Sequence, residues 1–79
     1  MDKKHVTIYS ADWCAFCHMA KDYLTKQGVP FEVKDVEHNM QYADESVQKS
    51  GQMGIPVIDI DGKIIVGFDR PRIDAALKA

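Results

Sequence analysis

Two different spacings of apolar residues divide the chain into predicted strands and helices. Val6 and Ile8 alternate with other residues in a short run, which predicts a strand over 5–10. From Cys14 onward the apolar residues recur every three or four positions, which is typical of a helix, and Gly28 favours the end of that helix. The same signals predict further strands over 31–36, 57–60 and 64–66 and helices over 14–27, 39–50 and from 70 onward.

The order of these elements predicts the fold. Two strands joined by a helix form a βαβ unit, whose crossover is right-handed and whose strands are parallel. Asp61-Gly62 accepts the positive φ angles of a type I′ turn, so the last two strands form a hairpin. Asp69 is a suitable cap for the final helix. The sequence therefore predicts an α/β fold of order βαβαββα, a four-stranded mixed sheet flanked by helices, with residues 1–79 as a single domain.

Helical spacing also predicts which side of each helix is buried. In the first helix the apolar face carries Phe16, Met19, Ala20, Tyr23 and Leu24. In the second helix it carries Met40, Ala43 and Val47, which stand among charged residues. We expect both faces to pack against the sheet.

Composition narrows the functions open to a chain of 79 residues. Isoleucine and valine far outnumber leucine, which agrees with a core built largely from strands. The formal net charge of -2 argues against a phosphate-binding surface, so we expect no nucleic-acid partner. No apolar run approaches the ~20 residues that cross a bilayer, and no signal peptide is recognisable. We therefore expect a monomeric, cytoplasmic protein without a membrane segment.

Cys14 and Cys17 are the only cysteines, and their spacing indicates redox chemistry. A reducing compartment disfavours structural disulfides, and a bridge that closes so short a loop removes only about 2 kcal/mol of chain entropy. Cys14 falls at the start of the first predicted helix, where free N–H groups and the helix dipole stabilise a thiolate. Cys17 lies almost one turn further along on the same side. The pattern predicts that Cys14 attacks a disulfide and that Cys17 resolves the product.

The same residues admit three other interpretations. The string CAFCH over residues 14–18 literally matches a c-type haem attachment motif. Zinc needs four ligands, and beyond the two cysteines and His18 only His5 and His38 offer nitrogen donors. In a redox-controlled interaction module, the disulfide state would alter a binding surface and turnover would be incidental. Because the chain lacks a recognisable export signal and a second ligand pair, we expect no metal and no bound prosthetic group.

Two polar neighbours bear on the expected thiolate. Asp12 precedes Cys14 by two residues, and its carboxylate would oppose thiolate formation if it lay close to the sulfur. His18 follows the cysteine that we expect to be buried, so we expect an exposed helix residue and not a general base.

Three markers in order resemble the glutaredoxin-like proteins of the thioredoxin superfamily. The first is the cysteine pair after the first strand. Gly54-Ile55-Pro56 stands where these proteins have Thr-Val-Pro before the hairpin, and Gly67-Phe68-Asp69 matches the glycine turn that opens their last helix. The resemblance covers nearly the whole chain. It implies a thioredoxin-like fold and a dithiol–disulfide oxidoreductase, an electron carrier that reduces protein or mixed disulfides.

The resemblance also implies a substrate-binding region. The Ile55–Pro56 bond would be cis and would pack beside the cysteines, leaving the backbone of Ile55 free to pair with a bound peptide or glutathione. An ordinary trans proline that starts the strand is the alternative. Gly67 either lets a substrate approach the backbone or relieves crowding at the strand end. The full expected set is Trp13, Phe16, Gln52, Ile55, Pro56, Gly67, Phe68 and Asp69.

Departures from the family pattern bear on the electron donor, which is either glutathione or a flavoprotein reductase. Where typical glutaredoxins carry a lysine and a further basic residue, this chain has Ala11 and Met53. Two basic residues expected to bind glutathione are therefore missing, although Gln52 and Asp69 could still bind it. The turn over 66–69 resembles the Ser-Gly-Phe turn of the redoxins that serve ribonucleotide reductase.

A reductase of the thioredoxin-reductase type needs no glutathione pocket. It must instead recognise the surface near the cysteines, where Trp13, Ile55 and Phe68 form an apolar collar suited to docking another protein. We therefore expect disulfide-containing protein substrates and a reductase of this type as partners.

Overall fold

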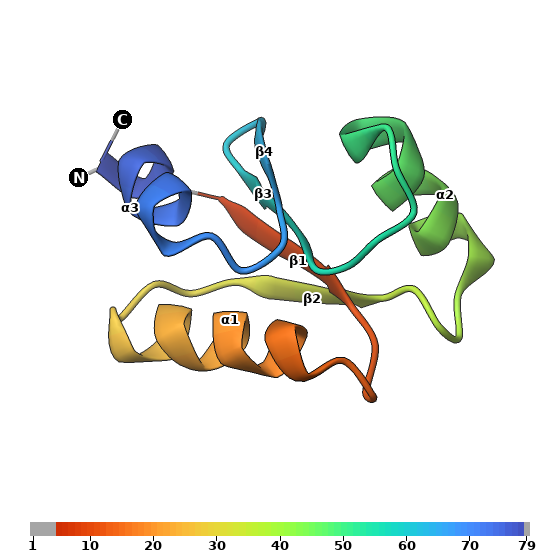
Figure 1. The fold of residues 1–79 in the computed structure, drawn as a ribbon, viewed down its shortest axis with the longest axis horizontal. Coiled ribbons are helices and arrows are strands. Elements are labelled where there is room, and N and C mark those ends of the chain that lie inside the picture. The colour runs from red at the N-terminus through yellow and green to blue at the C-terminus, as the bar shows by residue number, and fades with distance from the viewer. Residues whose placement is uncertain (1–4, 79) are drawn as a thin grey trace.

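The computed structural model describes residues 5–78 and confirms the predicted order of elements (Figure 1). The strands are β1 (Val6–Ser10), β2 (Glu32–Asp35), β3 (Val57–Ile60) and β4 (Lys63–Val66). The helices are α1 (Ala15–Lys26), α2 (Met40–Ser50) and α3 (Arg70–Lys78). No helix within residues 5–78 has the length and apolar content that would let it span a membrane.

The four strands form one mixed sheet in the order β2-β1-β3-β4. β1 runs parallel to β2, as the βαβ unit predicts, and β3 runs antiparallel to both of its neighbours. Asp61 and Gly62 have φ angles of 51° and 90°, so the predicted hairpin turn is confirmed. β1 is central, and all five of its residues are buried.

The side chains of β1 alternate between the two faces of the sheet, and each face is covered by different helices. Val6 and Ile8 belong to the main hydrophobic core, which also takes Ala20 and Leu24 from α1 and Ile73 from α3. Because alternate residues of a strand point to opposite faces, Thr7 and Tyr9 point the other way. That second face is covered by α2, which contacts β1 and β2. The sheet therefore separates α1 and α3 from α2.

The predicted buried face of α1 is only partly correct. Cys17, Ala20 and Leu24 are buried, but Phe16 is 60% exposed and Met19 is also exposed. The buried residues follow one another at intervals of three and four, which keeps them in a single stripe under the sheet. Phe16 and Met19 lie beside that stripe, so helical spacing identified the apolar residues but not which of them the sheet covers.

The expectation for α2 is met only by Ala43, which is half-buried, while the other two apolar residues of its predicted face are exposed. Met40 is 82% exposed, Val47 is exposed, and Ser46 is the buried residue of this helix. Polar side chains make the contact instead. The Tyr9 hydroxyl donates to Glu45 Oε1 at 2.7 Å.

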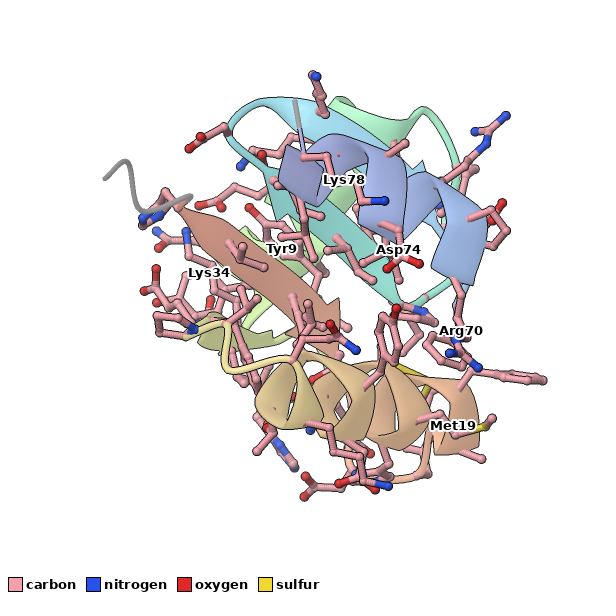
Figure 2. The ribbon with its side chains drawn as sticks, turned by 90° about the vertical axis from the view of Figure 1, so that its left-hand side faces the viewer. Tyr9, Met19, Lys34, Arg70, Asp74 and Lys78 are labelled. Carbon is pink, nitrogen blue, oxygen red and sulfur yellow. A yellow bond between two sulfur atoms is a disulfide. The ribbon has the colours of Figure 1, made fainter. Side chains whose placement is uncertain are left out.

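Two lysines complete this polar contact. Lys34 Nζ donates to Glu45 Oε1 at 3.0 Å, and Lys49 Nζ donates to Asp59 Oδ2 at 2.7 Å. Figure 2 labels Tyr9 and Lys34, which extend from the adjacent strands β1 and β2. We call these five residues the α2 clamp: Tyr9, Lys34, Glu45, Lys49 and Asp59. The clamp ties α2 to three strands of the sheet, so hydrogen bonds and ion pairs replace an apolar interface there.

Candidate functional site

The cysteine pair lies where β1 turns into α1. Cys14 is the N-cap residue of α1, with an extended backbone, and its Sγ accepts a hydrogen bond from the Cys17 N–H at 3.1 Å. The two cysteines are joined as a disulfide, and their Cα atoms lie 5.2 Å apart. Cys14 is 6% exposed and Cys17 is fully buried. Only Cys14 therefore offers an approaching sulfur a path, which agrees with its predicted role as the attacking residue.

His18 contacts the turn that precedes the cysteine pair. Its Nε2 lies 2.7 Å from the backbone carbonyl oxygen of Asp12, and its backbone N–H donates to the Cys14 carbonyl at 3.2 Å. His18 and Asp12 are both exposed. The prediction of an exposed helix residue is confirmed, and the imidazole contacts the Asp12 backbone, whereas the Asp12 carboxylate lies in solvent.

The loop before β3 carries the predicted cis peptide. The Ile55–Pro56 bond is cis, so the alternative of an ordinary trans proline is wrong. Pro56 is buried, and its carbonyl accepts a hydrogen bond from the Gly67 N–H at 2.8 Å. This bond joins the loop before β3 to the turn after β4.

An apolar cleft of about 620 Å³ opens between these segments. It is lined by Phe16, Ile55, Pro56, Val66, Gly67, Phe68, Asp69, Arg70 and Pro71. Six of the eight residues expected to bind substrate share this cleft; Trp13 and Gln52 do not line it. The sequence interpretation missed Val66, Arg70 and Pro71, although all three adjoin the glycine turn that it singled out. Phe16, which lies between the two cysteines in the chain, is the residue of this segment that lines the cleft, while Cys14 and Cys17 do not line it.

The Gln52 side chain forms hydrogen bonds within the loop that carries Ile55. Its Nε2 donates to Ser50 Oγ and to the Gly54 carbonyl, each at 3.0 Å, and its Oε1 accepts from the Gly54 N–H at 2.6 Å. The side-chain amide is therefore engaged within the loop and is not directed to the cleft. A Cβ at residue 54 would lie 2.7 Å from Gln52 Oε1, so the end of the Gln52 side chain would have to shift to admit one.

The turn after β4 positions the start of α3. Gly67 has φ 83°, and a Cβ there would meet nothing within 4 Å, so the crowding explanation for this glycine is wrong. A positive φ is the physical reason for the glycine. Asp69 Oδ1 accepts from the Arg72 N–H at 3.3 Å, which confirms Asp69 as the cap of α3.

The zinc interpretation requires ligands grouped around the cysteines. Within residues 5–78, three potential ligands come within 4.8 Å of one another at Asp35, Glu37 and His38, and neither cysteine belongs to that group. His38 Nδ1 lies 2.8 Å from Asp35 Oδ2. This hydrogen bond lowers the pKa of the Asp35 carboxyl and raises the pKa of His38. The pair thus forms a local ion-pair contact apart from the cysteines.

Comparisons with known proteins point to one family. The glutaredoxin family model matches residues 6–65. The chain is 38% identical over 73 residues to a glutaredoxin-like 8.6 kDa protein of the rubredoxin operon of Clostridium pasteurianum, covering 92% of this chain and 97% of that one. It is 35% identical over 65 residues to glutaredoxin 3 of Escherichia coli, covering 82% and 78%.

The fold is also found in solved structures. The crystal structure of methanoredoxin from Methanosarcina acetivorans superposes with a TM-score of 0.88 at 25% identity, covering 100% of this chain and 90% of that one. The thioredoxin-like fold expected from the sequence is therefore confirmed. The family match and the cysteine pair together support thiol–disulfide redox activity. The chain belongs to the glutaredoxin family, within the thioredoxin superfamily.

Proposed function

We propose that the protein is a dithiol–disulfide oxidoreductase that reduces protein or mixed disulfides and needs no bound prosthetic group. The observation that carries the proposal is the arrangement of the pair: Cys14 caps α1 two residues before Phe16, which lines an apolar cleft, and Cys17 is fully buried. A thiolate is the reactive form of cysteine, and a helix N-terminus favours it.

The reaction proceeds in two exchanges. The Cys14 thiolate attacks one sulfur of the substrate disulfide, a mixed disulfide forms, and the other substrate sulfur leaves as a thiolate. Cys17 then loses its proton and attacks Cys14 Sγ, which forms the Cys14–Cys17 disulfide and releases the second substrate thiolate. The substrate gains two electrons and, from solvent, two protons. The protein loses the same two electrons, and its oxidised form is the disulfide of the structure.

Apolar walls beside Cys14 suit the half of the substrate that becomes bonded to it. Phe16, Ile55 and Phe68 all line the cleft. Trp13 is 70% exposed next to Cys14, where it offers an aromatic contact to a protein partner.

A flavoprotein reductase of the thioredoxin-reductase type is the proposed electron donor. Ala11 is buried and Met53 is exposed, and neither residue provides a positive charge for a glutathione carboxylate. The amide of Gln52 is engaged by Ser50 and Gly54. Ala11 and Met53 therefore offer no charge to glutathione, and the Gln52 side chain is hydrogen-bonded within its own loop.

Replacement of each cysteine tests the proposal. In an insulin-reduction assay with dithiothreitol as the electron source, we expect Cys14→Ser to abolish catalysis. We expect Cys17→Ser to accumulate a mixed disulfide at Cys14, visible as an added substrate mass that a reductant removes. Wild-type turnover by Cys14→Ser would overturn the proposal. Elemental analysis and an absorption spectrum of the purified protein distinguish it from metal or haem binding.

A further inference from the structure

The turn between β1 and α1 is held by one side chain. Within this turn the Cys14 N–H donates to the Ala11 carbonyl at 3.1 Å (Figure 1). The central peptide of the turn joins Asp12 to Trp13, and its carbonyl oxygen lies 2.7 Å from His18 Nε2. Among residues 5–78 no other group forms a hydrogen bond with this peptide. His18 is therefore the side chain that fixes the orientation of the central peptide.

The same bond assigns a hydrogen to one ring nitrogen of His18. A carbonyl oxygen only accepts hydrogen bonds, so Nε2 carries a hydrogen, in the neutral imidazole as in the imidazolium. The helix brings the ring to this place, because His18 follows Cys14 by four residues and its backbone N–H donates to the Cys14 carbonyl at 3.2 Å. Side chains of an α-helix point toward its N-terminus, so the imidazole reaches back to the preceding turn.

Trp13 takes its position from the backbone of this turn. The other common type of β-turn reverses the central peptide and requires a positive φ at the third residue, which here is Trp13. Among the described residues Asp61 is the only non-glycine residue with a positive φ, so the turn has the orientation in which its central carbonyl meets His18. Trp13 is 70% exposed, and its indole forms no hydrogen bond or ring contact within residues 5–78. The direction of the ring therefore follows from the turn.

We infer that His18 is a positioning residue, which holds the Asp12–Trp13 peptide and thereby keeps the exposed Trp13 ring where a disulfide-containing protein meets it. The inference rests on the proposed function and adds a residue that favours protein substrates. An aromatic side chain that is already oriented loses less entropy when a partner docks on it. Cys14 has its own hydrogen bond from the Cys17 N–H, so a small disulfide that needs no contact with the indole gains nothing from His18.

Two substrates of different size test the inference. Insulin is a protein with disulfides, and bis(2-hydroxyethyl) disulfide is small and uncharged. The reduced protein is mixed with each in a single turnover, and the loss of its thiols is followed by alkylation and mass spectrometry. The readout is the ratio of the second-order rate constant for insulin to that for the small disulfide, so a change that affects both substrates equally cancels.

We expect His18→Leu to lower this ratio about threefold, an effect of the size of one exposed hydrogen bond. His18→Gln keeps a side-chain N–H donor and should retain most of the ratio. His5→Leu removes an exposed imidazole at the other end of β1 and should leave the ratio unchanged. Trp13→Ala should lower the ratio by itself, and adding His18→Leu should not lower it further, because His18 acts through Trp13.

A spectrum of the imidazole provides a readout that does not depend on turnover. A long-range ¹H–¹⁵N spectrum of the wild-type protein at pH 8 should place the His18 hydrogen on Nε2. A hydrogen on Nδ1, an unchanged ratio in His18→Leu, an equal loss in His18→Gln or a further loss in the double variant would overturn the inference and leave the proposed function intact. Failure of the wild-type protein to reduce insulin would also overturn the inference, and failure with both disulfides would overturn the proposed function as well.

Discussion

The backbone N–H of Cys17 lies 3.1 Å from Cys14 Sγ, so the second cysteine supplies a hydrogen bond donor to the first. This contact occupies the place of the usual helix N-cap bond, in which a side chain accepts from the backbone N–H three residues later. In most helices serine, threonine, aspartate or asparagine provides the acceptor. Here Cys14 Sγ provides the acceptor. In the reduced protein the Cys14 thiolate would accept the same hydrogen bond from the Cys17 N–H.

The pKa of Cys14 should consequently lie below the ordinary cysteine value of about 8.5. The N–H donor and the dipole of α1 both favour the thiolate over the thiol. The rate of alkylation by iodoacetamide, measured against pH in Cys17→Ser, reports this pKa, because only one thiol remains in that variant. We expect the midpoint to lie between about 4 and 7.5.

Asp12→Asn provides the control for this measurement. The Asp12 carboxylate is exposed, and the structure engages only the Asp12 backbone carbonyl, through His18. Solvent screens an exposed charge, so the variant should leave the midpoint nearly unchanged. A midpoint at or above that of a free thiol would contradict the prediction. If the midpoint were that high and Asp12→Asn lowered it, the Asp12 carboxylate would be the cause of the high Cys14 pKa.

Gly54→Ala should loosen the loop that carries Ile55. The new Cβ would lie 2.7 Å from Gln52 Oε1, so the end of the Gln52 side chain must shift, which weakens its hydrogen bonds to Gly54. The two bonds to Gly54 are exposed, so we expect a destabilisation of at most about 1 kcal/mol in total and slower insulin reduction.

Gln52→Ala is the matched variant for that prediction, because it removes the same bonds without a steric conflict. Urea unfolding of both single variants and of the double variant measures the coupling between them. The double variant should be less destabilised than the sum of the singles, since both changes remove the same interactions. Strict additivity would show that Gly54→Ala acts elsewhere.

Local signals were sufficient to predict the seven elements and the hairpin. Asp61-Gly62 specifies its turn through two positive φ angles, and Gly28 and Gly51 each have a positive φ next to the end of a helix. Each of these constraints acts over a few neighbouring residues, so the sequence displays it directly. The cysteine spacing similarly placed Cys14 at the N-cap of α1.

Long-range partners explain what the sequence could not predict. The buried side of α2 depends on the bond between Tyr9 and Glu45, which are 36 positions apart. Periodicity within a helix carries no information about a tyrosine on a distant strand, so the spacing of apolar residues did not identify the polar side of α2 that the sheet covers. Arg70 was missed for the same reason, because its orientation depends on Tyr23 of α1.

The α2 clamp should make a measurable contribution to stability. Tyr9→Phe removes the hydroxyl that donates to Glu45 and keeps the ring, so we expect a loss of about 1 kcal/mol in the free energy of unfolding. Tyr42→Phe is the control, because within residues 5–78 the Tyr42 hydroxyl forms no hydrogen bond. Urea denaturation at pH 7 compares the two variants. Equal losses would show that the Tyr9 hydroxyl is not responsible.

The clamp should also weaken in acid. Hydrogen bonds from Tyr9 and Lys34 lower the pKa of Glu45 below its ordinary value. A carboxyl whose folded pKa is lowered stabilises the protein above its unfolded pKa of about 4.3, and this contribution is lost as the pH falls through the folded pKa. Thermal unfolding between pH 7 and pH 3 should show a smaller decrease in Tm for Glu45→Gln than for the wild-type protein. Parallel curves would contradict the assignment to Glu45.

The electron donor is the remaining prediction, and it follows from the charges near the cysteines. Glutathione carries two carboxylates, and a charge-assisted hydrogen bond to each contributes about 1.5–3 kcal/mol. The structure offers Arg70 at the α3 end of the cleft, while Ala11 and Met53 provide no second cation. Arg70 is the only cation among the described residues that line the cleft, so the second glutathione carboxylate lacks a partner there.

A thioredoxin-reductase-type enzyme would instead contact the exposed Trp13 and the apolar cleft wall, which need no charge. NADPH oxidation compares the two donors directly: one assay couples the protein to glutathione and glutathione reductase, the other to thioredoxin reductase. We expect faster turnover with thioredoxin reductase, and Trp13→Ala should slow that assay more than the glutathione assay, because only a protein donor docks on the exposed ring. Efficient turnover with glutathione alone would overturn the donor prediction and leave the chemistry at Cys14 unaffected, since the same thiolate attack operates with either donor.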